Sequence, residues 1–165
     1  MWIYLLRHGV AEELGSGMTD ADRALTEQGR QKLRAARETW RRLLRDPSLV
    51  VTSPLLRARQ TAEVFLEATD AAEVLRVDES LVPGAQPRDA VTMLEGLMLA
   101  GTESVALVGH EPHLGCLLGE LITGQPRRPV PLKKGMLVGL QTEATTSLVC
   151  SLRFCLSQKD AAKLA

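Results

Sequence analysis

Two arginines and two histidines stand at three places where an apolar run of the chain ends. YLLRHGV contains Arg7 and His8, TSPLLRARQTAE contains Arg57, and VALVGHEP contains His110. A guanidinium group carries a permanent charge on forked donors, which match the oxygens of a phosphoryl dianion. A neutral imidazole can attack phosphorus near pH 7. These residue types therefore indicate a site for phosphoryl chemistry.

His8 is the candidate nucleophile of such a site. Arginine charges nearby disfavour the imidazolium form, so we expect them to lower the pKa of His8 and to leave one ring nitrogen unprotonated. Arg7 and Arg57 would hold the charge of the phosphoryl oxygens. Gly9, which has no Cβ, would let the backbone pass close to the phosphate.

The three motifs follow short apolar segments that are typical of strands buried on both faces. These segments are Trp2–Leu6, Leu49–Thr52 and Val105–Val108. In open α/β sheets, ligands bind beyond the carboxyl ends of the strands. The sequence therefore predicts that both arginines and both histidines meet at one edge of a sheet.

Four helical patterns alternate with these strands. They begin at Thr26 as an N-cap, at Ser53-Pro54, at Pro87 and at Pro112; the first runs to the RDPS segment and the last to TGQPRRPVP. Segments near 136–140 and 147–154 are expected to be closing strands. The alternation predicts one α/β domain over residues 1–165, with a mostly parallel sheet and helices on both faces.

The composition excludes several classes of function. Lys and Arg (20) balance Asp and Glu (20), and aromatic residues make up only 3%, so neither charge nor stacking rings indicate nucleic-acid binding. No apolar stretch reaches the roughly 18 residues of a membrane span, and no leader precedes the first strand. Cys116, Cys150 and Cys155 form an odd set, which fits buried apolar thiols in a reducing compartment and predicts a cytoplasmic protein.

Each motif also has a purely structural interpretation when it is taken alone. RHG could be a strand-end ion pair with a turn glycine, and Arg57 with Arg59 could be a solvated helix face. A metal site made by His8, His110 and His113 is not favoured, because two fixed cations would repel the metal and the last helix should point His113 away. We expect no metal or organic cofactor. The long polar segment 12–24 is a candidate rim for the site.

With these motifs in place, the sequence resembles the histidine phosphatase superfamily. Its members carry R-H-G near the N-terminus, S-P-L-x-R-A-x-Q-T-A at a helix start and a late G-H, and this chain has RHG at 7–9, SPLLRARQTA at 53–62 and GH at 109–110. The resemblance implies a phosphoglycerate mutase-like fold. It also implies that Arg7 and Arg57 bind the phosphoryl group, that His8 becomes phosphorylated and that His110 completes the pocket.

The chain length and the stretch DRALTEQG at 22–29 resemble the short, SixA-type branch of phosphohistidine phosphatases. By that similarity Arg23 would lie near the mouth of the pocket, although it could equally pair with Asp20 or Asp22 at the surface. The branch implies a phosphohistidine-bearing protein as the partner. Nothing in the residues predicts an oligomeric state.

Pro83 stands where larger superfamily members carry a glutamate that acts as general acid. Without that acid, an alkoxide leaving group would need a proton from Glu79, Glu111 or water, whereas a phosphoramidate can be protonated before its bond breaks. Glu111 is also a candidate substrate-binding residue. The absence favours a P–N substrate, and two alternatives stay open: a small-molecule phosphomonoesterase, and a module that binds phosphate or phosphoprotein without turnover.

The segment QPRRPVPLKKG at 125–135 concentrates positive charge that the rest of the chain balances. It is either a solvated basic loop or a surface that steers an acidic protein substrate.

Overall fold

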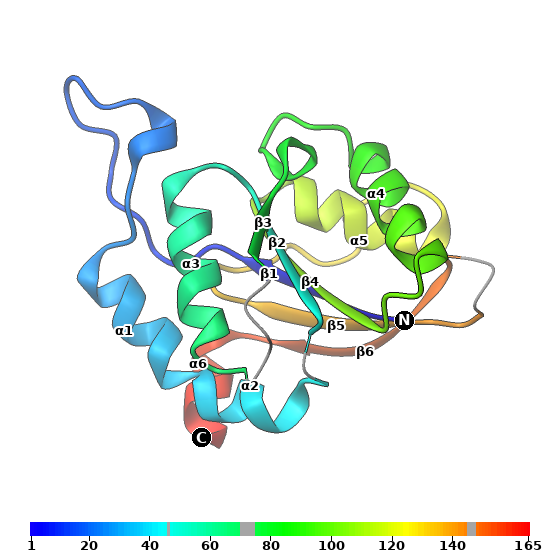
Figure 1. Cartoon of the computed structure of the whole chain (residues 1–165). Coiled ribbons are helices and arrows are strands. Elements are labelled where there is room, and N and C mark those ends of the chain that lie inside the picture. Colours follow the sequence, from blue (N-terminus) through cyan, green and yellow to red (C-terminus); the bar gives the residue numbers. More distant parts are fainter. Residues whose placement is uncertain (46, 70–74, 145–147) are drawn as a thin grey trace.

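A six-stranded sheet with helices on both faces is the framework that positions these motifs (Figure 1). The computed structural model describes residues 1–45, 47–69, 75–144 and 148–165. Its strands are β1 (Trp2–Arg7), β2 (Leu49–Thr52), β3 (Leu75–Val77), β4 (Ser104–Gly109), β5 (Leu137–Thr142) and β6 (Cys150–Leu156). Its α-helices are α1 (Glu27–Ala35), α2 (Arg37–Leu43), α3 (Leu56–Leu66), α4 (Pro87–Leu99), α5 (His113–Thr123) and α6 (Gln158–Leu164).

The strand order is β3-β2-β4-β1-β5-β6, and only β5 runs against its neighbours. Arg7, the last residue of β1, is in register with Gly109 at the end of β4, and Thr52 at the end of β2 is in register with Val108. Three strands therefore end at one edge. The predicted α/β class, mostly parallel sheet and two helical layers are confirmed.

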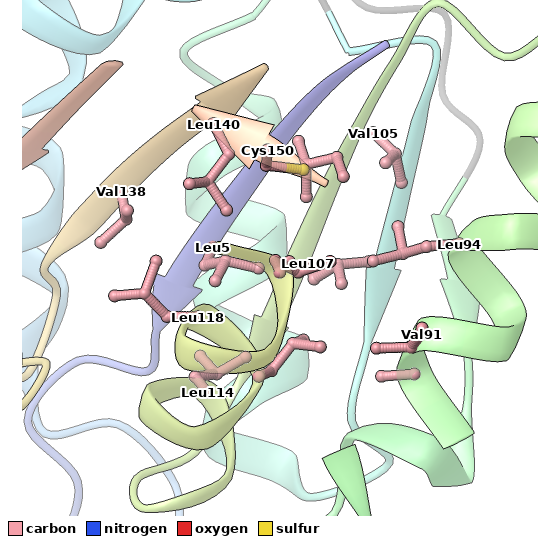
Figure 2. Packing of buried hydrophobic residues seen from close by; sticks show 14 of the residues in the cluster. Leu5, Val91, Leu94, Val105, Leu107, Leu114, Leu118, Val138, Leu140 and Cys150 are labelled. Carbon is pink, nitrogen blue, oxygen red and sulfur yellow. The ribbon is translucent and has the colours of Figure 1, made fainter. Parts of the chain in front are cut away.

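Alternating side chains of the strands build a core on each face of the sheet. On β1, Ile3 and Leu5 point to the face that α4 and α5 cover, while Tyr4 and Leu6 point to the face that α1, α2, α3 and α6 cover. Figure 2 shows the first of these cores, in which Leu107 of β4 lies between Leu5 and the α4 side chain of Leu94. Burial on both faces explains why the strand segments are continuously apolar.

Leu107 tests how much this core contributes to stability. Its side chain is fully buried in a central strand, so Leu107→Ala should lower the free energy of unfolding by about 2–5 kcal/mol through lost burial and a residual cavity. Leu99→Ala, at a position that is 84% exposed at the end of α4, is the matched control and should change it by less than about 0.5 kcal/mol. Chemical denaturation of both variants measures the difference, and equal effects would refute this description of the core.

One continuous helix from Thr26 to the RDPS segment was predicted, and this prediction is wrong because the structure has two helices there. Thr26 does cap α1, because its Oγ1 accepts a hydrogen bond of 2.9 Å from the Gly29 N–H. At Ala36, however, the N–H bonds to the carbonyl of Leu33, a tighter i to i−3 turn, and a second helix begins at Arg37. After this break, Trp40 enters the core, where its ring lies 5.7 Å from that of Phe65.

Two predicted helix starts lie too early. Helix α3 begins at Leu56, and no side chain caps it, so Ser53 is not its N-cap. Helix α5 begins at His113 with Pro112 as the preceding cap residue. Pro87 is the first residue of α4, as predicted.

Some elements were not predicted or were placed with different bounds. Neither β3, which is three exposed residues long, nor α6 was predicted. The closing strands were predicted at 136–140 and 147–154 but are β5 and β6, and residue 147 lies outside the described residues.

The expectation of three buried thiols is wrong: all three cysteines are free, but only Cys150 is buried and Cys155 is exposed. In the described ranges, no helix combines the length and apolarity that a membrane crossing requires.

Candidate active site

The ends of β1, β2 and β4 bring the sequence motifs together, as predicted. The His8 N–H donates to the Gly109 carbonyl at 3.0 Å, and the Ser53 N–H donates to the Val108 carbonyl at 3.0 Å. The rings of His8 and His110 lie 5.0 Å apart between centroids, at 51° to one another. Residues about 100 positions apart in the chain therefore form one site.

The hydrogen bond of His8 determines which of its nitrogens is available. His8 is buried, and its Nδ1 lies 2.7 Å from the carbonyl oxygen of Gly9. A carbonyl can only accept, so Nδ1 carries the proton in this contact. In the neutral ring, Nε2 then holds the lone pair.

Burial and nearby cations keep His8 neutral. They lower its pKa from 6.5 to about 4: burial is the largest cause, the Gly9 carbonyl acts in the opposite direction, and the charges of Arg57, Arg7 and Lys134 lower the pKa further. The arginine charges, which were expected to cause this shift, are a smaller effect than desolvation.

The partner histidine, His110, is also held neutral. Burial first, and then His8 and Arg57, lower its pKa to about 3, while Asp20 acts in the opposite direction. Its Nε2 lies 2.8 Å from Ser53 Oγ. Its Nδ1 and the Nε of Arg7 are buried and have no hydrogen-bond partner within the described residues, which leaves two polar atoms of the site for a bound group.

These pKa shifts predict how stability depends on pH. The unfolded chain protonates both imidazoles near pH 6.5, but the folded protein does so only near pH 4 (His8) and pH 3 (His110). Between pH 6.5 and pH 3 the unfolded chain binds more protons at these two rings than the folded protein does. Their contribution to the free energy of unfolding is therefore highest above pH 6.5 and decreases as the pH falls through this range. We expect the melting temperature to decrease from pH 7 to pH 4.5 less steeply in His8→Asn than in the natural protein. Parallel pH profiles for the two proteins would contradict these shifts.

Arg57 is buried in the first turn of α3 and is held by Asp20, which was expected only as a possible surface partner of Arg23. Its Nη1 donates to the Asp20 carbonyl at 2.6 Å, and its Nη2 lies 2.9 Å from Asp20 Oδ2. Arg23 reaches the same carboxylate at 2.8 Å. The hydrogen bonds from Arg23 and Arg57 lower the pKa of Asp20, which stays ionised. Arg23 therefore pairs with Asp20, and through Asp20 it is linked to Arg57 in the site. Asp20 is also the residue by which the segment 12–24 contacts the site.

Arg7 and Glu111 are the other charged residues predicted for the site, and the charge of Glu111 acts on Arg7. Arg7 Nη1 donates to the Leu132 carbonyl at 2.7 Å, and partial burial lowers the pKa of Arg7 while the charge of Glu111 raises it. The Glu111 carboxylate accepts the Gly115 N–H of α5 at 3.2 Å and lies 3.4 Å from Arg128. The role of Glu111 in substrate binding stays a prediction.

Gly9 has a packing role in addition to the one expected from the sequence, which stays a prediction. A Cβ on Gly9 would lie 2.8 Å from Leu33 Cδ1 and 3.3 Å from Leu25 Cδ2, so a side chain there would clash with these leucines. The Gly9 N–H donates to Thr61 Oγ1 at 3.1 Å, and that hydroxyl donates to the Arg57 carbonyl at 2.7 Å. Glycine therefore lets the His8 loop pack against α1 and α3.

Sequence reasoning missed three residues that support the site: Asp20, Ser53 and Thr61. Thr61 follows Arg57 by four positions, which is the spacing that lets a hydroxyl bond back along a helix, and this signal was present in the sequence. Ser53 was assigned to a helix cap and instead contacts His110. The pairing of Asp20 with Arg57 spans 37 residues and left no local pattern.

His113, whose charge is one of those that lower the pKa of His110, is a buried residue at the start of α5. Burial lowers its pKa, and the Gln86 carbonyl and Asp89 act in the opposite direction. Within the part of the chain that the structure describes, no three His, Cys, Asp or Glu side chains are grouped as a metal site.

Known proteins match this chain in sequence. Residues 3–82 match the profile of the histidine phosphatase superfamily (branch 1). An uncharacterized protein of Picosynechococcus sp. is 33% identical over 144 residues, which cover 87% of each chain. The phosphohistidine phosphatase SixA of Escherichia coli is 28% identical over 125 residues, which cover 76% of each chain.

Solved structures match the fold over nearly the whole chain. The protein histidine phosphatase SixA, solved with tungstate, superimposes with a TM-score of 0.86 at 24% identity, covering 96% of this chain and 98% of that one. A mycobacterial glucosyl-3-phosphoglycerate phosphatase, solved with VO3, gives a TM-score of 0.70 at 22% identity, covering 92% and 96%. The resemblance predicted from RHG, SPLLRARQTA and GH is confirmed: this chain belongs to branch 1 of the histidine phosphatase superfamily.

Proposed function

We propose that this superfamily member hydrolyses phosphohistidine on proteins through a covalent phospho-His8 intermediate, without a metal or organic cofactor. One observation carries the proposal: His8 is buried and neutral, its Nδ1 is engaged by the Gly9 carbonyl, and its Nε2 lone pair lies within the field of Arg7 and Arg57. This arrangement provides a nitrogen nucleophile beside the charges that an attacked phosphoryl group requires.

In the first step, His8 Nε2 forms a bond to phosphorus while the P–N bond of the substrate breaks. The electron pair of that bond returns to the substrate imidazole, which leaves as a neutral ring when its other nitrogen carries a proton. His8 gains positive charge as it is phosphorylated, and the Gly9 carbonyl stabilises its Nδ1–H in that form. Arg7 and Arg57 balance the charge of the phosphoryl oxygens, and His110 completes the pocket.

In the second step, water attacks phosphorus and the bond to His8 Nε2 breaks. The electron pair returns to Nε2, so His8 is again neutral, and the proton that water loses leaves with orthophosphate or passes to solvent. A cytoplasmic location stays a prediction.

The carboxylates near the site favour a P–N substrate over a phosphate ester. An alkoxide leaving group needs a proton, yet the paired arginines keep Asp20 ionised and Glu111 is bound to the Gly115 N–H and Arg128. Pro83, in an exposed turn, has no proton to give. Neither displacement at phosphorus requires such an acid when the leaving group is an imidazole.

The shape around the site supports a protein substrate. Residues 12–17 are exposed and project away from the body of the protein (Figure 1). The relative SixA of Escherichia coli is named a phosphohistidine phosphatase, which supports the same substrate class here.

A small-molecule phosphomonoesterase is the second candidate, because the glucosyl-3-phosphoglycerate phosphatase shares this fold. A non-catalytic phosphate-binding module is the third, and the paired neutral histidines argue against it, since binding an anion does not require an unprotonated nitrogen.

Comparing substrates tests the proposal directly. We expect kcat/KM for a phosphohistidine peptide to exceed that for any member of a panel of sugar phosphates, nucleotides and aryl phosphates by at least about a hundredfold, a difference of roughly 2.7 kcal/mol in transition-state stabilisation. A monoester that is turned over faster than the peptide would establish the second candidate instead. Binding of both without turnover would establish the third.

A further inference from the structure

A cavity of about 620 Å³ opens between α1, the segment before β5 and α6. Four lysines line it together with Gln158 and Asp160; these lysines are Lys32, Lys133, Lys134 and Lys159. We refer to it as the lysine cavity. The basic segment at 125–135 contributes Lys133 and Lys134 to this cavity, whereas Arg128 of the same segment pairs with Glu111.

The charge of the lysine cavity is not neutralised by the protein. Within the described ranges the ion pairs are made by arginines, and none of the four lysines lies within ion-pair distance of a carboxylate. Asp160, the acid among the lining residues, accepts a hydrogen bond from Ser157 instead. A chain with equal numbers of acidic and basic residues thus concentrates uncompensated positive charge in one hollow.

Gln158 provides a second, independent observation. It is 8% exposed, and its Nε2 has no hydrogen-bond partner in the described part of the protein. A buried donor without an acceptor is unfavourable, so an oxygen ligand in the cavity would satisfy it. The cavity is therefore built to receive an acceptor as well as negative charge.

The lysine cavity adjoins the candidate active site. The Gln158 amide packs so closely on Gly135 that a Cβ there would lie 2.7 Å from its Nε2. The Gly135 N–H in turn donates to the carbonyls of Arg7 and His8, at 3.1 and 3.2 Å. The charge of Lys134 is close enough to His8 to lower its pKa. A molecule with its phosphohistidine at His8 can thus present a neighbouring segment to the cavity.

We propose that the lysine cavity docks an acidic segment of the protein that carries the phosphohistidine; this inference rests on the proposed function. Lysine ammonium groups are hydrated point charges that suit several separate carboxylates, whereas the arginines of the active site offer forks for one phosphoryl group. No aromatic ring is among the described residues that line the cavity, so these residues offer no stacking platform for a nucleotide base. Carboxylate oxygens would also accept the Gln158 N–H.

Binding of an oligoglutamate peptide tests the cavity independently of catalysis. In low salt the natural protein should bind the peptide, with a change in the Gln158 side-chain NMR signal, and affinity should fall steeply as salt is added. The double variant K32E/K159E should weaken binding by at least about tenfold, while K163E/R41E, an equal charge change at exposed positions outside the cavity, should not. Binding that is absent, or equal in both variants, or matched by inorganic phosphate at the same charge concentration, would overturn the proposal.

Turnover of paired peptides tests whether docking serves the reaction. Two phosphohistidine peptides carry either an oligoglutamate or an oligoglutamine tail, joined by spacers of several lengths. The natural protein should turn over the glutamate peptide with kcat/KM about tenfold higher at the best spacer, chiefly through KM, and K32E/K159E should abolish that preference. Equal turnover of both tails by the natural protein would refute the docking role. If neither peptide is hydrolysed while oligoglutamate still binds the cavity, the proposed function fails and the link between cavity and substrate fails with it.

Discussion

Replacing His8 with asparagine is expected to lower kcat/KM for a phosphohistidine peptide by at least about a thousandfold, as removal of a covalent nucleophile does. The asparagine amide can take over the donation that His8 Nδ1 makes to the Gly9 carbonyl, but it has no atom equivalent to Nε2. The variant therefore retains the local hydrogen bond and loses the attacking nitrogen. Initial rates under single-turnover conditions measure the effect.

His113→Asn is the matched control, because His113 is also a buried histidine, in α5, and its charge is not among those that shift the pKa of His8. We expect it to retain most of the activity and to lose stability. Binding of orthovanadate to His8→Asn verifies that its anion site is still formed. If His8→Asn binds vanadate and still turns over substrate at more than a few per cent of the natural rate, His8 is not the nucleophile.

Arg57→Ala is expected to lower kcat by about a thousandfold, within the range found when a guanidinium that stabilises a transferring phosphoryl group is removed. Arg57 is 4% exposed, its charge acts on both His8 and His110, and two contacts with Asp20 fix its orientation. Arg57→Lys should recover little of this loss, since an ammonium group cannot make both Asp20 contacts and also face a phosphoryl group.

Arg59→Ala provides the control, because Arg59 stands two residues away on the same helix and is exposed. It should change kcat by less than about threefold, in line with the small effects of surface substitutions. Circular dichroism and thermal melting establish that each variant is folded. Similar losses in the Arg57 and Arg59 variants would show that general positive charge, rather than the fork of Arg57, serves the reaction.

The parts of this fold that could be predicted from sequence are those in which local pattern and tertiary environment agree. Strands buried on both faces must be apolar throughout, so Trp2–Leu6, Leu49–Thr52 and Val105–Val108 were found within one or two residues of β1, β2 and β4. Parallel strands end at one edge, so the positions of Arg7, His8, Arg57 and His110 after such strands predict that they lie together.

The parts that could not be predicted depend on contacts across the fold. The break at Ala36 occurs inside a helical pattern that is locally uninterrupted, and it is visible only once Trp40 is seen in the core. Helix α6 is short, and its placement depends on packing against α2, where the Thr39 hydroxyl donates to the Ala161 carbonyl. The Asp20 contact with Arg57 likewise joins a short 3-10 helix, Asp20–Asp22, to a helix that follows it by many residues.

For two residues the structure adds a physical cause that the sequence pattern did not indicate. Gly9 is needed because leucines of α1 and its preceding loop fill the space that a side chain would occupy. His8 is neutral chiefly because it is buried, with the arginines as a smaller cause. Sequence shows which residue types recur in a chemical pattern, but desolvation and close packing are properties of the assembled fold.

Trapping the phosphorylated enzyme tests the central claim most directly. The protein is mixed with a phosphohistidine peptide bearing a radiolabelled phosphoryl group, quenched in alkali within milliseconds, digested and mapped by mass spectrometry. We expect the label on His8, attached to Nε2, because Nδ1 donates to the Gly9 carbonyl. Label on Nδ1, on another residue, or nowhere on the protein during turnover would contradict the mechanism.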